Sequence, residues 1–296
     1  KKQLKVRKLV KINVNKHLKM DIRNWLDKYS KDCRLKYNSI STQDNYISQV
    51  KSFLYYFKDQ IEPKSIPNDL IKDWLLDAKT INTRKHRLCA INSFYSLTVR
   101  MPDKVGKIPY PKSEKKLPIV LSVEEVQKMF DVCENLKHKV ILSLLYSAGL
   151  RVSELINLKW VNIDRSRMII NIIGAKGNKD RQVTLATSLI PLLEKYCREY
   201  KPKEYIFNGA PGYMQYSDRS VLEVVKQLAQ KAGLRKRVYT HLMRHCSFTH
   251  MYESGIDISK IQALAGHNSP KTTQIYTHLS HNHISKLNSP LNAIRL

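Results

Sequence analysis

Acidic residues are scarce in this 296-residue chain. Asp and Glu number 25 against 52 Lys and Arg, which gives a formal net charge of +27. This excess is larger than solubility alone requires, and it favours binding to a polyanion such as duplex DNA through the release of counterions. A ribosomal or RNA-binding protein can have the same charge balance. The composition therefore predicts a nucleic-acid partner without separating DNA from RNA.

The chain also lacks a long hydrophobic run near its beginning. Residues 1–20 contain no acidic residue, and their apolar side chains form no continuous core of the length that a signal peptide or a membrane span needs. We therefore predict a basic N-terminal segment at residues 1–20, no membrane partner, and a cytoplasmic, nucleoid-associated protein.

Paired cysteines and metal-ligand clusters are missing as well. The five cysteines are odd in number, lie far apart and form no Cys-x-x-Cys pair, so zinc and redox sites are not expected. No group of carboxylate, His or Cys residues has the spacing of a metal site. We expect reduced, mostly buried cysteines and no cofactor.

A cluster of prolines divides the chain. Four of the eleven prolines fall within residues 101–118, among Lys, Gly and Ser residues, which is typical of an interdomain linker. The length of the chain favours two domains over one. We predict a helical DNA-binding domain at residues 21–100, a second domain at 119–280, and a C-terminal tail at 281–296.

The first domain shows helical periodicity, with one helix start predicted at Ser41 and Thr42. A later helix, at about residues 82–97, would direct Leu88, Ile91 and Phe94 inward and carry three basic residues near its beginning. A basic helix start suits a DNA groove, although such a trio is also common on a solvated helix face. Because the net charge is so high, we predict that the trio binds DNA; it consists of Arg84, Lys85 and Arg87.

The second domain combines helices with one β-hairpin. Ser122 is predicted to cap a helix, and another helix runs from about residue 137 to 148 and ends at Gly149. Residues 168–173 and 182–185 read as strands on either side of a turn at 174–180. Helices follow from residue 240 onward, and one that opens at Ser269 and Pro270 includes Tyr276. The predicted fold is mainly α with a small antiparallel β-hairpin or sheet.

Four short motifs follow one another in this second domain. They read LLYSAGLRVSEL at residues 144–155, GAKGNKDRQVTL at 174–185, HLMRH at 241–245, and LAGHNSPKTTQIYTHL at 264–279. In this order they resemble the motifs of the tyrosine recombinases, and they are most similar to those of Xer-like recombinases and of phage or mobile-element integrases. The likeness spans residues 117–280, and the helical domain before the linker is a looser match to the family's core-binding domain.

The resemblance implies a site-specific DNA recombinase that folds as a two-domain clamp, with a helical core-binding domain and a catalytic domain. All six catalytic positions of the family are filled here, by Arg151, Lys176, His241, Arg244, His267 and the nucleophile Tyr276. Met243 and Cys246 stand where Leu and a small residue are usual. A buried helix is expected to accept both changes.

The two arginines suit the transfer of a phosphoryl group. A phosphodiester attacked by a phenol gathers negative charge on its non-bridging oxygens, and Arg151 and Arg244 can bind these oxygens with paired hydrogen bonds. Glu154, one helical turn from Arg151, is expected to orient this arginine or neighbouring side chains through hydrogen bonds, without contacting the DNA itself. On this reasoning no metal is required.

The remaining positions suit the movement of protons. Tyrosine has an ordinary pKa of about 10 and needs a base, for which we assign His241, while His267 would hydrogen-bond the phosphate. Lys176, at the hairpin tip, would protonate the departing 5′ oxygen. The expected product is a 3′-phosphotyrosyl ester, which keeps the energy of the broken bond and makes ATP unnecessary. The segment GAKGNK is not a P-loop, because its spacing differs and it lies between strands.

Three other functions share part of this pattern. A type IB topoisomerase uses similar side chains to relax supercoils, but the chain length and the particular residues of the four motifs favour a recombinase. A DNA-binding factor without catalysis would be marked by the loss of Tyr276 or of either arginine, and these residues are present. An RNA-binding protein would explain the charge but not the ordered motifs. The target site and the choice among integration, excision, inversion and dimer resolution stay open.

Recombination joins two duplexes and uses four active sites. We therefore predict a homodimer on each double-stranded DNA site and a tetramer at synapsis. The tail at 281–296 carries apolar residues at helix-like spacing, interrupted by Pro290. It would either dock onto a neighbouring subunit or pack back on its own domain.

Overall fold

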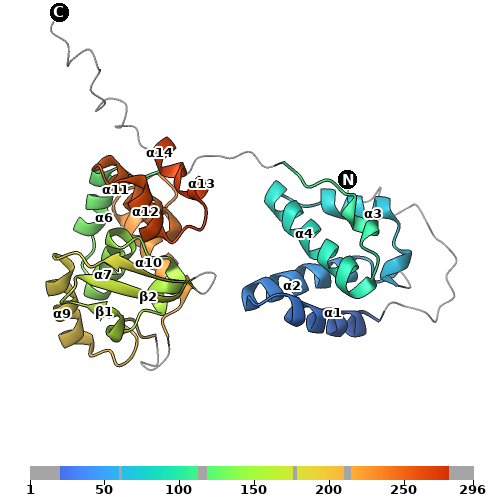
Figure 1. The fold of residues 1–296 in the computed structure, drawn as a ribbon, viewed down its shortest axis with the longest axis horizontal. Coiled ribbons are helices and arrows are strands. Elements are labelled where there is room, and N and C mark those ends of the chain that lie inside the picture. Colours follow the sequence, from blue (N-terminus) through green and yellow to red (C-terminus); the bar gives the residue numbers. More distant parts are fainter. Residues whose placement is uncertain (1–20, 60–61, 113–118, 176–178, 210–214, 280–296) are drawn as a thin grey trace, which may run out of the picture. The chain divides into compact units, whose positions relative to one another are not determined.

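The chain forms two compact units, residues 1–115 and 116–296, each with a hydrophobic core of its own (Figure 1). The computed structural model describes residues 21–59, 62–112, 119–175, 179–209 and 215–279. The predicted fold class, mainly α with a small antiparallel sheet, is confirmed. In the described ranges, no helix has both the length and the apolar character needed to cross a membrane.

The described part of the first unit contains helices joined by short irregular segments and no strand. It contains α1 (Ile22–Lys36), α2 (Ile40–Tyr56), α3 (Asn68–Leu76), α4 (Ile81–Phe94) and α5 (Asp103–Gly106), a 3-10 turn at Pro63–Ser65 and a π-helical turn at Tyr95–Val99. Polar side chains cap the starts of three of these helices, at Asp21, Ser39 and Thr80. The helix start predicted at Ser41 and Thr42 was therefore placed too late, because Ser39 provides the cap.

The core of this unit is rich in aromatic rings. Phe53 packs edge-on against Trp74 at 5.1 Å, and Tyr29 packs against Phe94 at 5.3 Å, in the geometry that aromatic pairs prefer. The helix predicted at about 82–97 is α4, and its apolar residues Leu88, Ile91 and Phe94 are buried as predicted.

The second unit combines helices with a small sheet. The helices are α6 (Val123–Asp131), α7 (Leu136–Ser147), α8 (Val152–Ile156), α9 (Leu189–Tyr200), α10 (Asp218–Lys231), α11 (Thr240–Glu253), α12 (Ile258–Ala265), α13 (Pro270–Thr273) and α14 (Ile275–Leu279). Ser122 begins α6 as predicted, in a capping box with Glu125. Helix α7 lies at the centre of the core and packs against α9 and α11.

The sheet is antiparallel, in the order β1 (Ile163–Asp164), β2 (Ile169–Ala175) and β3 (Lys179–Thr184). Strands β2 and β3 form the predicted hairpin, with Ile170 opposite Val183. Strand β1 was not predicted, because two residues are too few for an alternating pattern to be recognised.

The last helices differ from the single helix that the sequence predicted. Helix α13 ends at Thr273 and α14 begins at Ile275, so Tyr276 lies in the first turn of a new helix. Ser269 makes no capping hydrogen bond, although Pro270 does occupy the first helical position. The break lies beside Thr273, which is fully buried and hydrogen-bonded to His267. Figure 1 shows α11 to α14, in orange and red, gathered at one end of their unit.

Candidate active site

Arg151 lies in the turn between α7 and α8, and this turn depends on a glycine. Gly149 has a φ of +57°, in the left-handed region, and a Cβ atom there would lie 2.6 Å from the Phe248 ring. Just after the turn, the backbone N–H of Arg151 donates to Oε2 of Glu154 at 2.7 Å, and its Nη1 donates to Oε1 at 2.7 Å. The segment RVSE thus ties the backbone and the side chain of Arg151 to one carboxylate.

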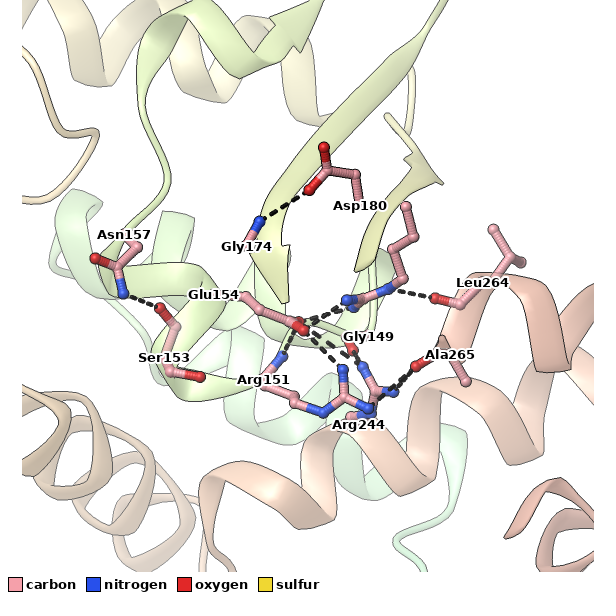
Figure 2. A network of polar contacts seen from close by, with 11 residues as sticks. Gly149, Arg151, Ser153, Glu154, Asn157, Gly174, Asp180, Arg244, Leu264 and Ala265 are labelled. Atoms are coloured by element: carbon pink, nitrogen blue, oxygen red, sulfur yellow. Dashed lines mark hydrogen bonds and ion pairs between the residues drawn. The ribbon is translucent and has the colours of Figure 1, made fainter. Parts of the chain in front are cut away.

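Arg244 reaches the same place from α11. Its side chain is 1% exposed, and Nη1 donates to the carbonyl oxygen of Gly149 at 2.5 Å. The carbonyl oxygen of Ala265 accepts hydrogen bonds from both Arg244 and Arg151, as Figure 2 shows. Burial, together with the charge of Arg151, lowers the pKa of Arg244 to about 10, so it stays protonated at neutral pH. The structure therefore brings the two predicted arginines together.

Glu154 is buried between the arginines. Its side chain is 4% exposed and accepts two hydrogen bonds from Arg181, from Nη1 at 2.5 Å and from Nη2 at 2.7 Å, besides those from Arg151. Burial raises the pKa of Glu154, but the hydrogen bonds and charges of Arg181 and Arg151 outweigh it and bring the pKa to about 2. This carboxylate is the counter-charge for the cluster of arginines.

Tyr276 packs on the same side of the unit, in a small apolar cluster with Phe248, Ile261 and Ala265. Its side chain is 1% exposed. Burial raises the pKa of the Tyr276 hydroxyl to about 12, while the positive charges of Arg244 and Arg151 act in the opposite direction. In this state the phenol is protonated and covered by protein.

Three histidines are connected to Tyr276 by ring contacts. The His267 ring stacks on the Tyr276 ring at 6.2 Å, and the His245 ring lies 5.8 Å from it. The exposed His241 contacts His245 at 4.7 Å. Although His241 is exposed, the protein around it removes part of its ring's hydration, and this desolvation, with the positive charges of Arg244 and Arg151, lowers its pKa. Burial, with nearby positive charges acting in the same direction, lowers the pKa of both His245 and His267 to about 4. At neutral pH these imidazoles are therefore uncharged.

Lys176 lies outside the described residues. The hairpin is described on both sides of it: Ala175 pairs with Lys179, and the backbone N–H of Gly174 donates to Asp180 at 3.0 Å. Strand β3, which follows the predicted lysine in the chain, contacts the site through Arg181, which bonds to Glu154.

The predicted DNA-binding trio belongs to the first unit, on α4. Lys85 is exposed, whereas the Arg87 guanidinium donates to the carbonyl of Trp74 at 2.7 Å and lies 4.6 Å from the centre of its ring. Arg84 is partly buried, and its Nε has no hydrogen-bond partner among the described residues. Lys85 is therefore the member of the trio most open to a ligand.

Sequence reasoning missed Arg181 and His245. A signal for Arg181 was present, because alternate residues of a strand share one face, and Arg181 alternates with Val183 and Leu185, which are both buried. An arginine in register with core residues needs a buried acid as partner. His245 lies one helical turn after His241, so the two rings share a face of α11.

Comparison with known proteins adds to this geometry. The sequence model of the phage integrase family matches residues 120–283, more than half of the chain. The chain belongs to the phage integrase family. It is 32% identical over 274 residues to the tyrosine recombinase XerD of Rickettsia bellii, covering 80% of this chain and 88% of that protein. It is also 37% identical over 198 residues to the tyrosine recombinase XerA of Pyrococcus horikoshii, covering 66% of this chain and 68% of that protein.

Solved structures of this family have the same fold. A crystal structure of a lambda integrase dimer bound to a COC′ core site has a TM-score of 0.74 with 20% sequence identity, covering 90% of this chain and 98% of that one. Family membership and the relatives make this chain a tyrosine recombinase, an enzyme of site-specific recombination, as the motifs predicted.

Proposed function

We propose that this recombinase cleaves and rejoins double-stranded DNA at a specific site through a 3′-phosphotyrosyl bond to Tyr276. The observation that carries the proposal is the convergence of Arg151, Arg244 and Tyr276 in one small region of the second unit. Both guanidinium charges act on the Tyr276 hydroxyl, and both groups meet at the Ala265 carbonyl.

The two arginines would bind the scissile phosphate. Each guanidinium has five N–H donors, of which only some are engaged by Glu154 and by backbone carbonyls. The free donors match the two non-bridging oxygens, where negative charge develops as the phenol attacks. Because the arginines are held by protein bonds before DNA arrives, little reorganisation is needed, and no metal ion is required in this scheme.

Proton transfer would involve the histidines and the hairpin lysine. Because Tyr276 is buried and protonated, DNA binding must bring its hydroxyl to the phosphorus and let it pass its proton to a base. The exposed, uncharged His241 is our candidate for this base. His267 would hydrogen-bond the phosphate, and Lys176 would protonate the 5′ oxygen that leaves.

The chemistry conserves the energy of the phosphodiester. The Tyr276 oxygen bonds to phosphorus as the bond from phosphorus to the 5′ oxygen breaks, and a 5′ hydroxyl from another strand later reverses the step. One ester replaces another, so neither ATP nor another cofactor is consumed.

We further propose that residues 21–100 bind DNA, that 119–280 form the catalytic domain, and that the enzyme acts in the cytoplasm at the nucleoid. Assembly into a dimer on each site and a tetramer at synapsis is supported by analogy with lambda integrase, whose structures include a dimer bound to a core site and a tetramer bound to a Holliday junction. The net charge of +27 supports a DNA partner.

A plasmid assay tests the proposal. The preferred site is first selected from a random duplex library, and two copies are then placed on a supercoiled plasmid. Incubation with EDTA and without ATP should give excised or inverted products, and Tyr276→Phe should give none. Relaxation of the supercoiled plasmid without strand exchange would instead indicate a topoisomerase. Binding to the plasmid without any strand cleavage would indicate a regulatory factor.

A further inference from the structure

Arg181 is a buried, multiply hydrogen-bonded arginine at the site. Its side chain is 6% exposed, and three of its donors are used: Nε bonds to the Leu264 carbonyl at 2.8 Å, and Nη1 and Nη2 bond to the two oxygens of Glu154. A side chain so buried and so occupied is not available to DNA. Its effect on catalysis must act through the groups that it holds.

Glu154 has no acceptor capacity to spare. A carboxylate offers about four lone-pair sites, and Glu154 accepts two hydrogen bonds from Arg181 and two from Arg151. Arg244 Nη1 stays 3.9 Å from Oε2, beyond hydrogen-bond distance, and donates to a carbonyl instead. Without Arg181, two acceptor sites would open beside Arg151 and Arg244 and would compete with a phosphate for their N–H groups.

The second contact of Arg181 fixes the end of α12. Leu264, whose carbonyl it holds, directly precedes Ala265, whose carbonyl accepts from Arg151 and Arg244. The backbone also passes close to Arg181 at Gly266, which has a φ of +61° and where a Cβ atom would lie 2.8 Å from Arg181 Cδ. The next residue in the chain is His267, one of the predicted catalytic residues. Arg181 therefore touches both supports of the arginine pair, the Glu154 carboxylate and the end of α12.

We propose that Arg181 is a positioning residue for the phosphate-binding arginines: it saturates Glu154 and anchors the end of α12, so that Arg151 and Arg244 keep N–H groups free for DNA. This role rests on the function proposed above. It also joins three of the four sequence motifs, because Arg181 comes from β3, Glu154 from α8 and Leu264 from α12.

Single-turnover cleavage of a nicked duplex that carries the selected site tests this role. Arg181→Gln should slow formation of the covalent product by about 10- to 100-fold, the effect expected when reacting groups are slightly misplaced. Arg181→Lys should fall between this variant and the wild type, because an ammonium cannot bond to both carboxylate oxygens as a fork. The matched control is Arg167→Gln, whose side chain is 77% exposed, and it should cleave at the wild-type rate.

A double variant separates positioning from simple loss of structure. In Arg181→Gln combined with Glu154→Gln no carboxylate competes for the arginines, so cleavage should be faster than in Arg181→Gln alone. A double variant as slow as or slower than that single variant overturns the role. All variants are compared at a temperature at which thermal unfolding shows the wild type, Arg181→Gln and the double variant to be folded, because Glu154→Gln itself lowers the stability of this unit. If Arg181→Gln does not fold, the same comparison is made with Arg181→Lys. A wild-type protein that forms no covalent product overturns the proposed function, whereas equally fast wild-type and Arg181→Gln proteins overturn only the role of Arg181.

Discussion

Replacing Glu154 with Gln should strongly destabilise the second unit. Glu154 is 4% exposed and pairs with Arg181, which is 6% exposed, and with Arg151. It also lies 3.9 Å from Arg244, which is 1% exposed. Glutamine has nearly the same shape, but its side chain is neutral and has one acceptor oxygen in place of two. The substitution therefore leaves buried guanidinium groups without their counter-charge.

The size of the effect follows from two independent routes. The pKa of Glu154 is about 2 in the folded chain against an ordinary 4.5. At 1.36 kcal/mol for each pKa unit this gives a contribution of about 3 kcal/mol at neutral pH. Removing one partner of a buried ion pair costs about 3–5 kcal/mol. For a unit that runs from residue 116 to 296, a loss of this size lowers the melting temperature by roughly 6–20 °C.

Thermal and urea unfolding of the wild type and the variant measure this effect. The matched control is Glu199→Gln, on the exposed face of α9, which should change the free energy of unfolding by less than about 0.5 kcal/mol. Because the folded pKa of Glu154 is lowered, its contribution is present above about pH 4.5 and is lost as the pH falls towards 2. The difference in the free energy of unfolding between the wild type and Glu154→Gln should therefore become smaller as the pH falls from about 4.5 towards 2. The reasoning would be refuted if Glu154→Gln lost no more stability than Glu199→Gln. It would also be refuted if the difference in the free energy of unfolding between wild type and Glu154→Gln did not depend on pH.

Three further predictions concern other parts of the chain. Gly149→Ala should destabilise the second unit by more than Gly233→Ala in urea unfolding, because both glycines have positive φ but only Gly149 faces a ring at 2.6 Å; equal losses would contradict this. The pKa of both His245 and His267 is about 4 in the folded chain, below the ordinary 6.5. Between these two pH values the unfolded chain binds more protons than the folded chain, so stability should fall as the pH drops from about 6.5 to 4. Replacing both histidines with Gln should flatten that slope. Lys85→Ala should weaken DNA binding and reduce the slope of log affinity against log salt concentration by about 0.9; an unchanged slope would count against a phosphate contact. Arg87→Ala should chiefly lower the stability of the first unit, where the Arg87 guanidinium lies against the Trp74 ring.

Much of the fold could be predicted, because its signals are local. The capping box at Ser122, the apolar face of α4 and the glycine that ends α7 each depend on residues a few positions apart. The break between α13 and α14 could not be foreseen in this way. It lies beside Thr273, whose hydroxyl bonds to the His267 ring in a contact that only the folded chain reveals.

The residues of the candidate site could be proposed from the motifs, but the network of contacts that joins them could not. The motifs named Arg151, Arg244, His267 and Tyr276, and the structure brings these residues to one region. The burial of Tyr276 and the contacts of Arg181 join segments far apart in the sequence, as in the bond from Arg181 to Leu264. Charge and periodicity carry no information about such pairings.

The most direct test of the whole account is the identity of the residue that becomes joined to DNA. The protein is incubated with a nicked duplex of the selected site, the trapped complex is digested with protease, and the DNA-linked peptide is sequenced by mass spectrometry. We predict a 3′-phosphate ester on Tyr276, and no adduct from Tyr276→Phe. Attachment to another residue, or an adduct that persists in Tyr276→Phe, would contradict the account.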